Sequence, residues 1–375
     1  MRITVLGAGM VGRAIALDLA NLHEVVSLDQ SVEALQKLAS GNPSIRTQQA
    51  NLQDYSSYRE WLHETDLVVS AVPGFMGYKT LETVIRCGKP VVDISFFPED
   101  ALTLDQLAKE KQVTAIVDCG VAPGLSNLAL GYCDARMQVE NFHCMVGGLP
   151  KERVWPFEYK APFSPIDVLE EYSRPARYVE QGRIVTRPAL SDPELIDFPG
   201  IGTLESFNTD GLRSILYTMR HIPNMKEKTL RYPGHIRLIE ALIKSGFFDT
   251  TERMVNGQRI RPIDATASIL FDQWKLDDND EEFTVMKIEV SGTENGKDKK
   301  FVFDIYDERD KASGISSMSR TTGYTCTAGV QLIQNGLFAE KGVYPPELVG
   351  RKEGCFDFIR QYLHERAVQI KITEY

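Results

Sequence analysis

The sequence predicts a two-domain α/β protein in which a doubly wound parallel sheet precedes an α+β domain with a mostly antiparallel sheet. From residue 2 to residue 127, short apolar runs alternate with helical patterns, which is the order that builds a parallel sheet covered by helices on both faces. Beyond residue 127 the alternation is lost, and apolar runs at 283–290 and 301–306 flank a polar stretch, as in an antiparallel hairpin. The 375 residues exceed what one hydrophobic core usually holds.

The first strand turns through a glycine-rich segment directly into a helix. Gly7, Gly9 and Gly12 have the GxGxxG spacing, which in a dinucleotide-binding Rossmann unit gives a tight turn, room for a pyrophosphate and close packing of helix on strand. The free N–H groups and the positive dipole end of the helix attract the phosphate charge. We therefore expect Met10 and Val11, at the start of the helix, to contact the cofactor.

The second strand, residues 25–28, ends at Asp29, twenty residues after Gly9. This is the distance expected for the carboxylate that accepts hydrogen bonds from the adenosine ribose. A carboxylate at this place repels a 2′-phosphate, and Gln30 and Ser31 follow it where an NADP site would favour arginine. The predicted cofactor is therefore NAD rather than NADP.

The remaining elements of the first domain continue the alternation. They are a helix at 32–39, a strand at 45–50, a helix at 55–63, a strand at 66–72, a helix at 80–87, a strand at 90–95, a helix at 104–111 and a strand at 114–118. Ligands bind outside the carboxyl ends of such strands. The further cofactor contacts expected there are Asn51, Ala71, Val72, Pro73, Asp93, Cys119 and Val121.

The first domain, for NAD binding, is expected to span residues 1–127, and the second, for substrate binding and oligomerisation, residues 128–317. A helix predicted at 323–335 suggests that the segment 318–350 returns to the first domain. The acidic run at 277–282 is expected to be a solvated loop.

Composition excludes several classes of protein. The net charge of −10, with no basic patch or basic helix, argues against binding to nucleic acid or to anionic membranes. No apolar run reaches the roughly 18 residues needed to span a bilayer, and Met1 leads almost directly into the first strand without room for a signal peptide. The six cysteines are scattered without a CxxC pair, so we expect free thiols in a reducing cytoplasm and no metal site.

Several motifs, well separated along the chain, add to this interpretation. They are residues 118–127, Phe163-Ser164-Pro165 with Glu171-Tyr172, and residues 174–177, 204–213 and 227–235. Together they cover nearly the whole chain in order. They resemble the motifs of the saccharopine dehydrogenase-like oxidoreductases, and within this family most closely those of the lysine 6-dehydrogenase branch.

The resemblance implies an NAD-dependent oxidation in which a carbon that bears an amine gives up a hydride. In the lysine 6-dehydrogenase branch the ε-amine of L-lysine becomes an imine, and water then releases ammonia to leave 2-aminoadipate 6-semialdehyde. One position departs from the saccharopine reductase branch, which has an aspartate just before Pro-Gly in the loop after the sixth strand, whereas this chain has Ala122. This difference counts against saccharopine as the substrate.

Such an oxidation needs a proton acceptor, because an alkyl ammonium, with a pKa of about 10.4, must first lose a proton. The candidate catalytic residues are Lys79, Asp118 and His235. Lys79 follows the fourth strand beside the expected nicotinamide, Asp118 ends the sixth strand, and His235 follows a Tyr-Pro-Gly turn. Each also has a structural interpretation: an exposed lysine at a helix start, a turn cap and a packed histidine.

The carboxylate of an amino-acid substrate calls for a guanidinium group, which can bind both oxygens. Arg174, Arg177, Arg213 and Arg231 are the options, and Arg231 is preferred because it lies within the motif at 227–235. The expected substrate-binding residues are Tyr172, Arg174, Asn208, Thr209, Arg231 and Tyr232.

Two other functions remain open at this point. A saccharopine dehydrogenase or another opine-like amine dehydrogenase would need room for a second dicarboxylate and at least two arginine clamps. A non-catalytic NAD-binding regulatory protein would bind the cofactor without amine-dependent reduction. The resemblance also implies a homodimer or a higher homo-oligomer, with the sheet of the second domain as the contact.

Overall fold

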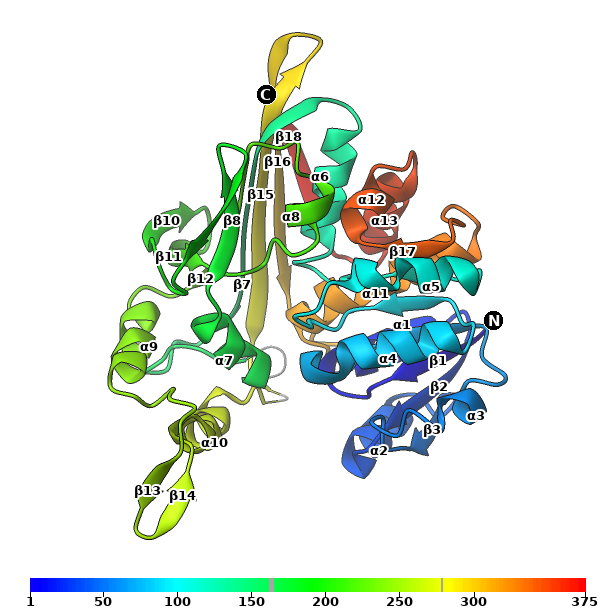
Figure 1. Ribbon diagram of the computed structural model, residues 1–375, viewed down its shortest axis with the longest axis horizontal. Helices are drawn as coiled ribbons and strands as arrows, with labels where there is room; N and C mark the ends of the chain where they lie inside the picture. Colours follow the sequence, from blue (N-terminus) through cyan, green and yellow to red (C-terminus); the bar gives the residue numbers. More distant parts are fainter. Residues whose placement is uncertain (162–164, 278) are drawn as a thin grey trace.

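The computed structural model describes residues 1–161, 165–277 and 279–375. Two sheets lie side by side, each with helices around it (Figure 1). This arrangement confirms the predicted α/β fold with two sheets. Phe163 and Ser164 of the motif named above, and Asp278 of the acidic run, lie outside the described residues.

The first sheet consists of seven parallel strands in the order β17-β6-β5-β4-β1-β2-β3. Their bounds are β1 (Arg2–Leu6), β2 (Glu24–Asp29), β3 (Arg46–Gln49), β4 (Leu67–Ser70), β5 (Val91–Asp93), β6 (Thr114–Ile116) and β17 (Gly342–Tyr344). β1 pairs with β2 on one side and with β4 on the other, so the strand order reverses at β1. Ligands of doubly wound sheets bind in the crevice outside the carboxyl ends of the strands at this switch point.

Helices cover both faces of the first sheet (Figure 1). They are α1 (Met10–Leu19), α2 (Val32–Gly41), α3 (Tyr58–Trp61), α4 (Gly74–Arg86), the 3₁₀ helix η1 (Ala101–Leu104), α5 (Asp105–Glu110) and α11 (Ser317–Gln334). α11 comes from the C-terminal part of the chain and packs against α1. The contact is close, because a Cβ on Gly323 of α11 would lie 3.3 Å from Ile15 Cγ1 of α1.

Two of these helices begin earlier than the sequence predicted. α4 begins at Gly74 and not at Thr80, because Pro73 stands just before the first turn, where a missing N–H costs no hydrogen bond. Gly77 interrupts the apolar pattern of α4 but lets the helix approach β5, since a Cβ there would lie 2.6 Å from Phe97 Cδ1. α11 begins at Ser317, six residues before the predicted start.

The second sheet is mixed, with the strand order β10-β11-β12-β7-β15-β16-β18, and β8 pairs with both β12 and β9. The bounds are β7 (Gln138–Pro150), β8 (Ala176–Glu180), β9 (Arg183–Arg187), β10 (Glu194–Phe198), β11 (Gly202–Asn208), β12 (Asn224–Arg231), β15 (Glu282–Glu294), β16 (Lys297–Glu308) and β18 (Ile370–Glu374). β7 and β12 are parallel, and the other neighbouring strands are antiparallel. The prediction of a mostly antiparallel sheet is thus confirmed.

The other elements surround the second sheet or connect it to the first. They are α6 (Leu125–Asp134), α7 (Pro165–Ser173), α8 (Ile215–Thr218), α9 (His235–Lys244), α10 (Pro262–Trp274), α12 (Pro346–Gly350), α13 (Cys355–Glu365) and a separate hairpin of β13 (Arg253–Val255) and β14 (Gln258–Ile260). Among the described helices, none combines the length and the apolar character of a membrane span. All six cysteines, each within the described residues, are free thiols.

The hairpin of β15 and β16 is longer than its apolar runs indicated. The two strands pair without interruption through the polar stretch at 291–300, and Asn295 and Gly296 form the turn with φ values of 51° and 74°. Two left-handed residues of the type Asn-Gly are typical of a tight hairpin turn.

At the base of the same hairpin, the prediction of a solvated acidic loop is wrong for Glu282. This residue is buried and its carboxylate accepts a hydrogen bond from the Ser317 N–H at the start of α11, where the helix dipole favours a negative charge.

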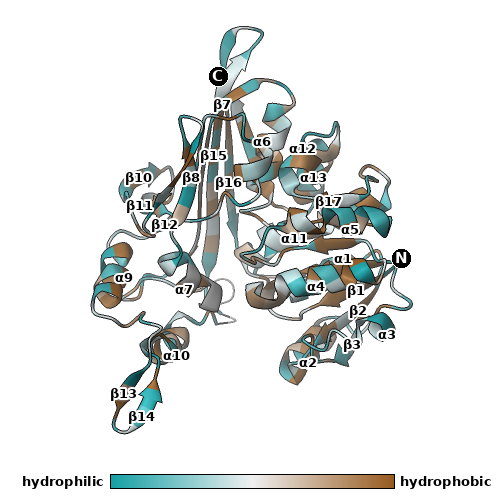
Figure 2. Cartoon of the chain, in the orientation of Figure 1, coloured by the Kyte–Doolittle hydropathy of each residue, from teal (hydrophilic) through white to brown (hydrophobic). Residues whose placement is uncertain are grey.

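The hydrophobic core joins the two sheets. Brown, hydrophobic positions gather on the strands in Figure 2, and the helices turn teal sides outward. One buried cluster contains Ile3 of β1, Ile15 of α1, Phe142 of β7 and Phe303 of β16. Because this cluster contains residues of both sheets, the two parts of the molecule are joined by a shared core.

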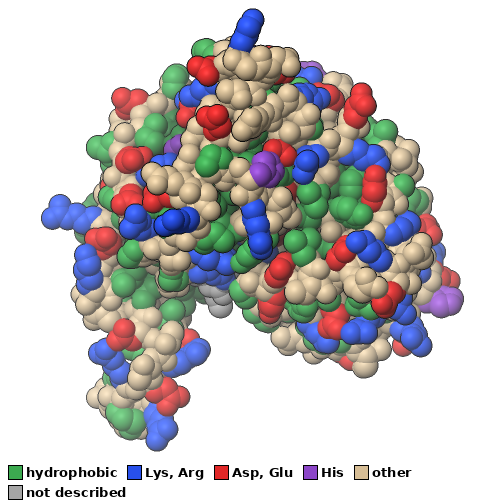
Figure 3. All heavy atoms as spheres, turned by 45° about the horizontal axis from the view of Figure 1, so that its top comes forward, with side chains coloured by type: hydrophobic (Ala, Val, Ile, Leu, Met, Phe, Trp, Pro, Cys, Tyr) green, Lys and Arg blue, Asp and Glu red, His purple; other side chains and the backbone are tan. Residues whose placement is uncertain are grey.

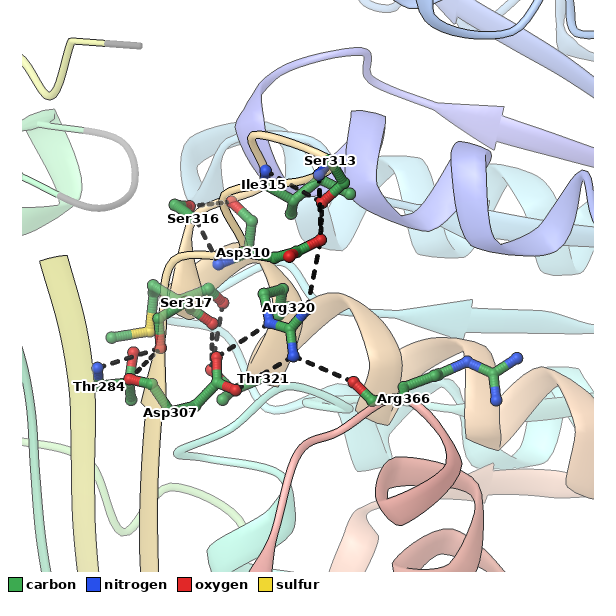
Figure 4. A network of polar contacts seen from close by, with 12 residues as sticks. Thr284, Asp307, Asp310, Ser313, Ile315, Ser316, Ser317, Arg320, Thr321 and Arg366 are labelled. Atoms are coloured by element: carbon green, nitrogen blue, oxygen red, sulfur yellow. Dashed lines mark hydrogen bonds and ion pairs between the residues drawn. The ribbon is translucent and has the colours of Figure 1, made fainter. Parts of the chain in front are cut away.

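A buried polar network fixes α11 to the second sheet (Figure 4). Arg320 donates from Nε to Asp307 Oδ2 at 3.1 Å and from Nη2 to Asp307 Oδ1 at 3.2 Å, and it also donates to the Arg366 carbonyl at 3.0 Å. Ser317 donates to the Asp307 carbonyl at 2.8 Å and accepts from the Thr284 N–H at 3.0 Å. The network thereby connects α11, β15, β16 and the turn after α13.

We expect Arg320→Met to lower the free energy of unfolding by about 3–5 kcal/mol, because it leaves the carboxylate of Asp307 buried without its partner. Urea denaturation measures the change, and adding Asp307→Asn should recover part of the loss. Arg86→Met, which removes an exposed ion pair with Glu82, is the control and should cost less than about 1 kcal/mol. An equal, small effect of both substitutions would contradict the structural role of the network.

Candidate active site

A cavity of about 660 Å³ lies at the carboxyl ends of the parallel strands and reaches the second sheet. Its walls come from both parts of the molecule, including β1, β4 and the loop after β6 on one side and β7, α7 and β12 on the other. In Figure 3 the surface is notched between the lobe at the lower left, which carries α9 and α10, and the first domain at the lower right.

The glycine-rich turn between β1 and α1 has the shape of a phosphate cradle. Gly7 has a φ of 106°, and a Cβ there would lie 2.4 Å from the Ala71 carbonyl oxygen. A Cβ on Gly12 would lie 2.1 Å from the Gly7 carbonyl oxygen, whereas a Cβ on Gly9 would meet nothing within 4 Å. The first and third glycines thus permit close packing, and the second leaves open space before the N-terminus of α1. These residues fit a bound dinucleotide.

Asp29 stands at the end of β2 beside this turn. Its Oδ2 accepts a hydrogen bond from the Ala8 N–H at 2.6 Å, and its Oδ1 accepts one from the Ser31 N–H at 2.8 Å. Asp29 and Gln30 line the cavity. The carboxylate is therefore fixed at the place where the ribose of a dinucleotide would lie.

The structure brings most of the predicted site residues to the cavity. Those in its lining are Gly7, Gly9, Met10, Val11, Gly12, Asp29, Asn51, Ala71, Val72, Pro73, Val121, Asp118, Arg174, Thr209 and Arg231. Seven predicted residues are not in the lining: Lys79, Asp93, Cys119, Tyr172, Asn208, Tyr232 and His235.

Asp93 and Cys119 lie behind the cavity wall. Asp93 is fully buried and accepts hydrogen bonds from the Ser95 N–H at 3.1 Å and the Ser95 hydroxyl at 2.9 Å, and it is Ser95 that lines the cavity. Burial raises the pKa of the Asp93 carboxyl to about 7. The Cys119 thiol points toward α11, where it donates to the Thr325 carbonyl at 3.6 Å. Neither side chain is placed to contact a cofactor.

Lys79 also lies away from the cavity. Since α4 begins at Gly74, Lys79 is in the second turn of the helix, and its side chain is 55% exposed. Its Nζ donates to Glu82 Oε2 at 2.7 Å. The prediction of a desolvated lysine beside the nicotinamide depended on a helix that began later.

His235 is held in the neutral form by two hydrogen bonds. Its Nδ1 lies 2.8 Å from the Phe157 carbonyl oxygen, which can only accept, so this nitrogen carries the proton. Its Nε2 then accepts from the Tyr172 hydroxyl at 2.9 Å, and the Tyr172 oxygen accepts from Arg231 Nε at 3.1 Å. Burial and the charge of Arg231 lower the pKa of His235 to about 3. His235 is thus a positioning residue for Tyr172 and Arg231 and not a proton shuttle.

The guanidinium of Arg231 reaches the cavity from the last residue of β12. Besides its contact with Tyr172, its Nη2 lies 3.2 Å from Glu171 Oε2. Two predicted neighbours point elsewhere, because Tyr232 donates to the Pro150 carbonyl at 2.8 Å and Asn208 donates to Asp192 Oδ2 at 2.8 Å. Thr209, which does line the cavity, shares a hydrogen bond of 3.0 Å with Thr229.

Asp118 forms an ion pair that crosses the cleft. Arg213 donates from Nε to Asp118 Oδ2 at 3.1 Å, and its Nη2 lies 2.9 Å from Asp118 Oδ1. Arg213 also donates to the Phe97 carbonyl and stacks over the ring of Phe96 at 4.5 Å. At least three of the four arginines considered for a substrate carboxylate therefore contact protein carboxylates, since Arg177 makes two hydrogen bonds of 2.9 Å to Asp210 and Arg231 contacts Glu171.

Sequence reasoning missed Glu227. Its side chain, with those of Thr229 and Arg231, lines the cavity from alternate positions of β12. In residues 1–161, 165–277 and 279–375, no hydrogen bond or ion pair to its carboxyl group is present. Burial, and then the charges of Glu171 and Asp210, raise the pKa of Glu227 to about 8. Alternate side chains of a strand lie on the same face, so the position of Glu227 four residues before Arg231 was the sequence signal that could have identified it.

The described residues contain no cluster of three or more histidine, cysteine, aspartate or glutamate side chains that could hold a metal ion.

Comparisons with known proteins agree with this geometry. The family model described as the saccharopine dehydrogenase NADP binding domain matches residues 3–116, and the one described as the saccharopine dehydrogenase C-terminal domain matches residues 120–368. A solved structure of saccharopine dehydrogenase (L-Glu forming) from Saccharomyces cerevisiae has a TM-score of 0.80 at 18% identity, covering 100% of this chain and 99% of that one. Homospermidine synthase from Legionella pneumophila, solved with NAD, has a TM-score of 0.67 at 15% identity, covering 100% of this chain and 91% of that one.

Curated relatives are similar over part of their length. The saccharopine dehydrogenase [NADP(+), L-glutamate-forming] of Pyricularia oryzae is 25% identical over 285 residues, which are 72% of this chain and 62% of that protein. The mitochondrial alpha-aminoadipic semialdehyde synthase of Mus musculus is 26% identical over 270 residues, which are 66% of this chain and 28% of that protein. The matches thus span less than two thirds of either relative. With both family models in order along the chain, this protein belongs to the saccharopine dehydrogenase family of oxidoreductases.

Proposed function

We propose that this protein oxidises the ε-amine of L-lysine with NAD, releasing ammonia and leaving 2-aminoadipate 6-semialdehyde. The observation that carries the proposal is one cavity that joins the glycine cradle to a pocket rich in carboxylates. Bound NAD supplies the hydride acceptor. The protein's own residues must bind an amino acid, orient its amine-bearing carbon and take up one proton.

The charges of the pocket favour a cationic substrate. Asp118, Glu171, Asp210 and Glu227 line it together with Arg174 and Arg231. Arg213 forms an ion pair with Asp118, and Arg177 forms one with Asp210. Arg231 contacts Glu171. A lysine brings one ammonium group on its side chain to this pocket, whereas saccharopine would bring additional carboxylates close to Glu171, Asp210 and Glu227.

The carboxylate of the substrate fits the arginines in the lining. Arg231 is fixed by Tyr172 and, through Tyr172, by His235, so little side-chain freedom is lost when it binds an anion. Such preorganised guanidinium groups bind carboxylates in two hydrogen bonds. Arg174, whose guanidinium lies over the ring of Phe96 at 5.3 Å, is a second arginine in the same lining.

A saccharopine-type or other opine-like reaction is the second candidate. It is favoured by the activity in the name of the Pyricularia relative, a saccharopine dehydrogenase, and by the presence of two arginines in the cavity lining. Ala122, where the saccharopine reductase branch has an aspartate, speaks against it.

NAD is the cofactor that Asp29 supports, although the matching family model is described as NADP binding. A carboxylate fixed beside the ribose accepts hydrogen bonds from its hydroxyls and repels a 2′-phosphate. Both oxygens of Asp29 are already oriented by backbone N–H groups of Ala8 and Ser31.

The purified protein with NAD should reduce the cofactor when L-lysine is added at alkaline pH, and ammonia should appear in equal amount. NADH absorbance follows the reaction, with saccharopine, ornithine and cadaverine in parallel. Cadaverine has the same terminal amine without the carboxylate, so we expect its kcat/KM to be at least tenfold lower. A higher kcat/KM for saccharopine than for lysine would replace the first proposal by the second, and cofactor binding without reduction by any amine would contradict both.

Asp29→Asn removes the charge and keeps a hydrogen-bond acceptor. We expect it to raise the ratio of kcat/KM for NADP to that for NAD at least tenfold, because the repulsion of the 2′-phosphate is lost. Glu33→Gln, an exposed acid in the first turn of α2, is the matched control and should leave the ratio unchanged. A wild-type protein that already prefers NADP would overturn the assignment of Asp29.

A further inference from the structure

We infer that Glu227 accepts the proton that the substrate ammonium loses, an inference that rests on the function proposed above. The N–H bond of the ammonium breaks, and the proton forms an O–H bond with a carboxylate oxygen of Glu227. The nitrogen lone pair is then free to form the C=N bond as the neighbouring C–H bond gives its electron pair to NAD as hydride. Glu227 ends this step as a neutral carboxylic acid.

The residues expected to accept this proton are not available for it. The side chain of Lys79 is outside the cavity on the exposed face of α4. Both ring nitrogens of His235 are engaged, with Phe157 and with Tyr172. Asp118 lines the cavity, but its two oxygens face the guanidinium of Arg213 at 3.1 and 2.9 Å.

Glu227 differs from Asp118, Glu171 and Asp210, the other acidic residues in the lining of the substrate pocket, in having no cation bound to it. Asp118, Glu171 and Asp210 each contact an arginine within 3.2 Å, whereas no such contact to Glu227 is found among the residues that the structure describes. An ammonium group is the ligand that this vacant carboxylate can bind most strongly. Binding and deprotonation then occur at the same oxygen atoms.

Gly211 makes the room in which the carboxyl group of Glu227 lies. A Cβ on Gly211 would be 1.9 Å from Glu227 Oε1 and 2.1 Å from Cδ. Gly211 lines the cavity and stands two residues before Arg213, which reaches across to Asp118 at the end of the first sheet. The loop from Thr209 to Arg213 therefore passes directly beside the carboxyl group of Glu227 and also reaches Asp118 of the first domain.

The surroundings make Glu227 a suitable base at mildly alkaline pH. Burial raises the pKa of its carboxyl group most, Glu171 of α7 and Asp210 of the loop raise it further, and Arg213 lowers it. The buried thiol of Cys144 on β7 lies next to it. Below a pH of about 8 the group in the free protein is protonated and cannot accept a proton. The reaction rate should therefore rise with pH through this range.

The test is the pH dependence of kcat/KM for lysine in the wild type, in Glu227→Gln and in Glu227→Asp. We expect Glu227→Gln to lower kcat/KM at pH 8 at least about 100-fold, as is usual for loss of a general base. The rise of kcat/KM near pH 8 should disappear from the pH profile, whereas the rise due to deprotonation of the substrate amine should stay. Glu227→Asp should restore part of the rate. Glu289→Gln, which changes an ion-paired glutamate of β15 in the same sheet, is the control and should behave as the wild type.

A second readout needs neither cofactor nor turnover. Infrared difference spectra of the apo protein between pH 6 and pH 10 should show the C=O band of a protonated carboxyl group disappearing near pH 8 in the wild type and in Glu289→Gln, but not in Glu227→Gln. The carboxyl groups of Asp93 and Glu282, whose pKa burial raises to about 7, should contribute the same change in all three proteins. The thermal stability of Glu227→Gln relative to the wild type should also increase with pH, because the native state of the wild type must lose a proton that it binds more tightly than the unfolded chain does.

The possible failures are distinguishable. If the wild type oxidises lysine and Glu227→Gln keeps its pH profile, the role of Glu227 is overturned while the proposed function stands. If the wild type oxidises no amine, the proposed function fails, and the role of Glu227 as acceptor of this proton fails with it. If the full band change near pH 8 persisted in Glu227→Gln, the assignment of that titration to Glu227 would equally be overturned.

Discussion

The ion pair of Asp118 and Arg213 is the contact on which the candidate site depends. Its partners come from the end of the parallel sheet and from a loop of the second domain, and both side chains are less than 10% exposed. A buried charge without its partner is costly, so the two walls of the cavity are held at a fixed separation here. The hydrogen bond from Arg213 to the Phe97 carbonyl adds a third segment, the one that follows β5.

This ion pair also determines which charged groups of the cavity remain available to contact a ligand. Arg213 and Arg177 neutralise two carboxylates, and the chain of His235, Tyr172 and Arg231 orients a guanidinium toward the cavity. The substrate part of the cavity is thereby built from groups whose positions are set before anything binds. Preorganisation of this kind lowers the free energy that a ligand must spend on ordering the protein.

The fold was largely predictable because its signals are local. The GxGxxG turn, Asp29 at the end of β2 and the alternation of apolar runs with helices each lie within a short window of sequence. The start of α4 was missed because Gly74 and Gly77 hide its period, although packing against Phe97 requires a glycine at 77. Lys79 was misplaced as a direct result.

The part of the candidate site that the second sheet contributes was less predictable because its signals depend on distant pairings. Glu227 faces the cavity only because β12 lies parallel to β7, which places residues 224–229 beside residues 141–146. The role of His235 depends on Phe157 and Tyr172, which are 78 and 63 residues away. Ion-pair partners such as Asp118 and Arg213, 95 residues apart, have no sequence pattern that joins them.

The return of the chain to the first sheet affects how the protein can be made. α11 covers α1, which carries the glycine cradle, and β17 completes the sheet beside β6. Both segments are translated after the whole of the second sheet except β18. On the ribosome, the nucleotide-binding half therefore stays unfinished, with the apolar surface around Ile15 uncovered, until the chain has emerged beyond α11 and β17.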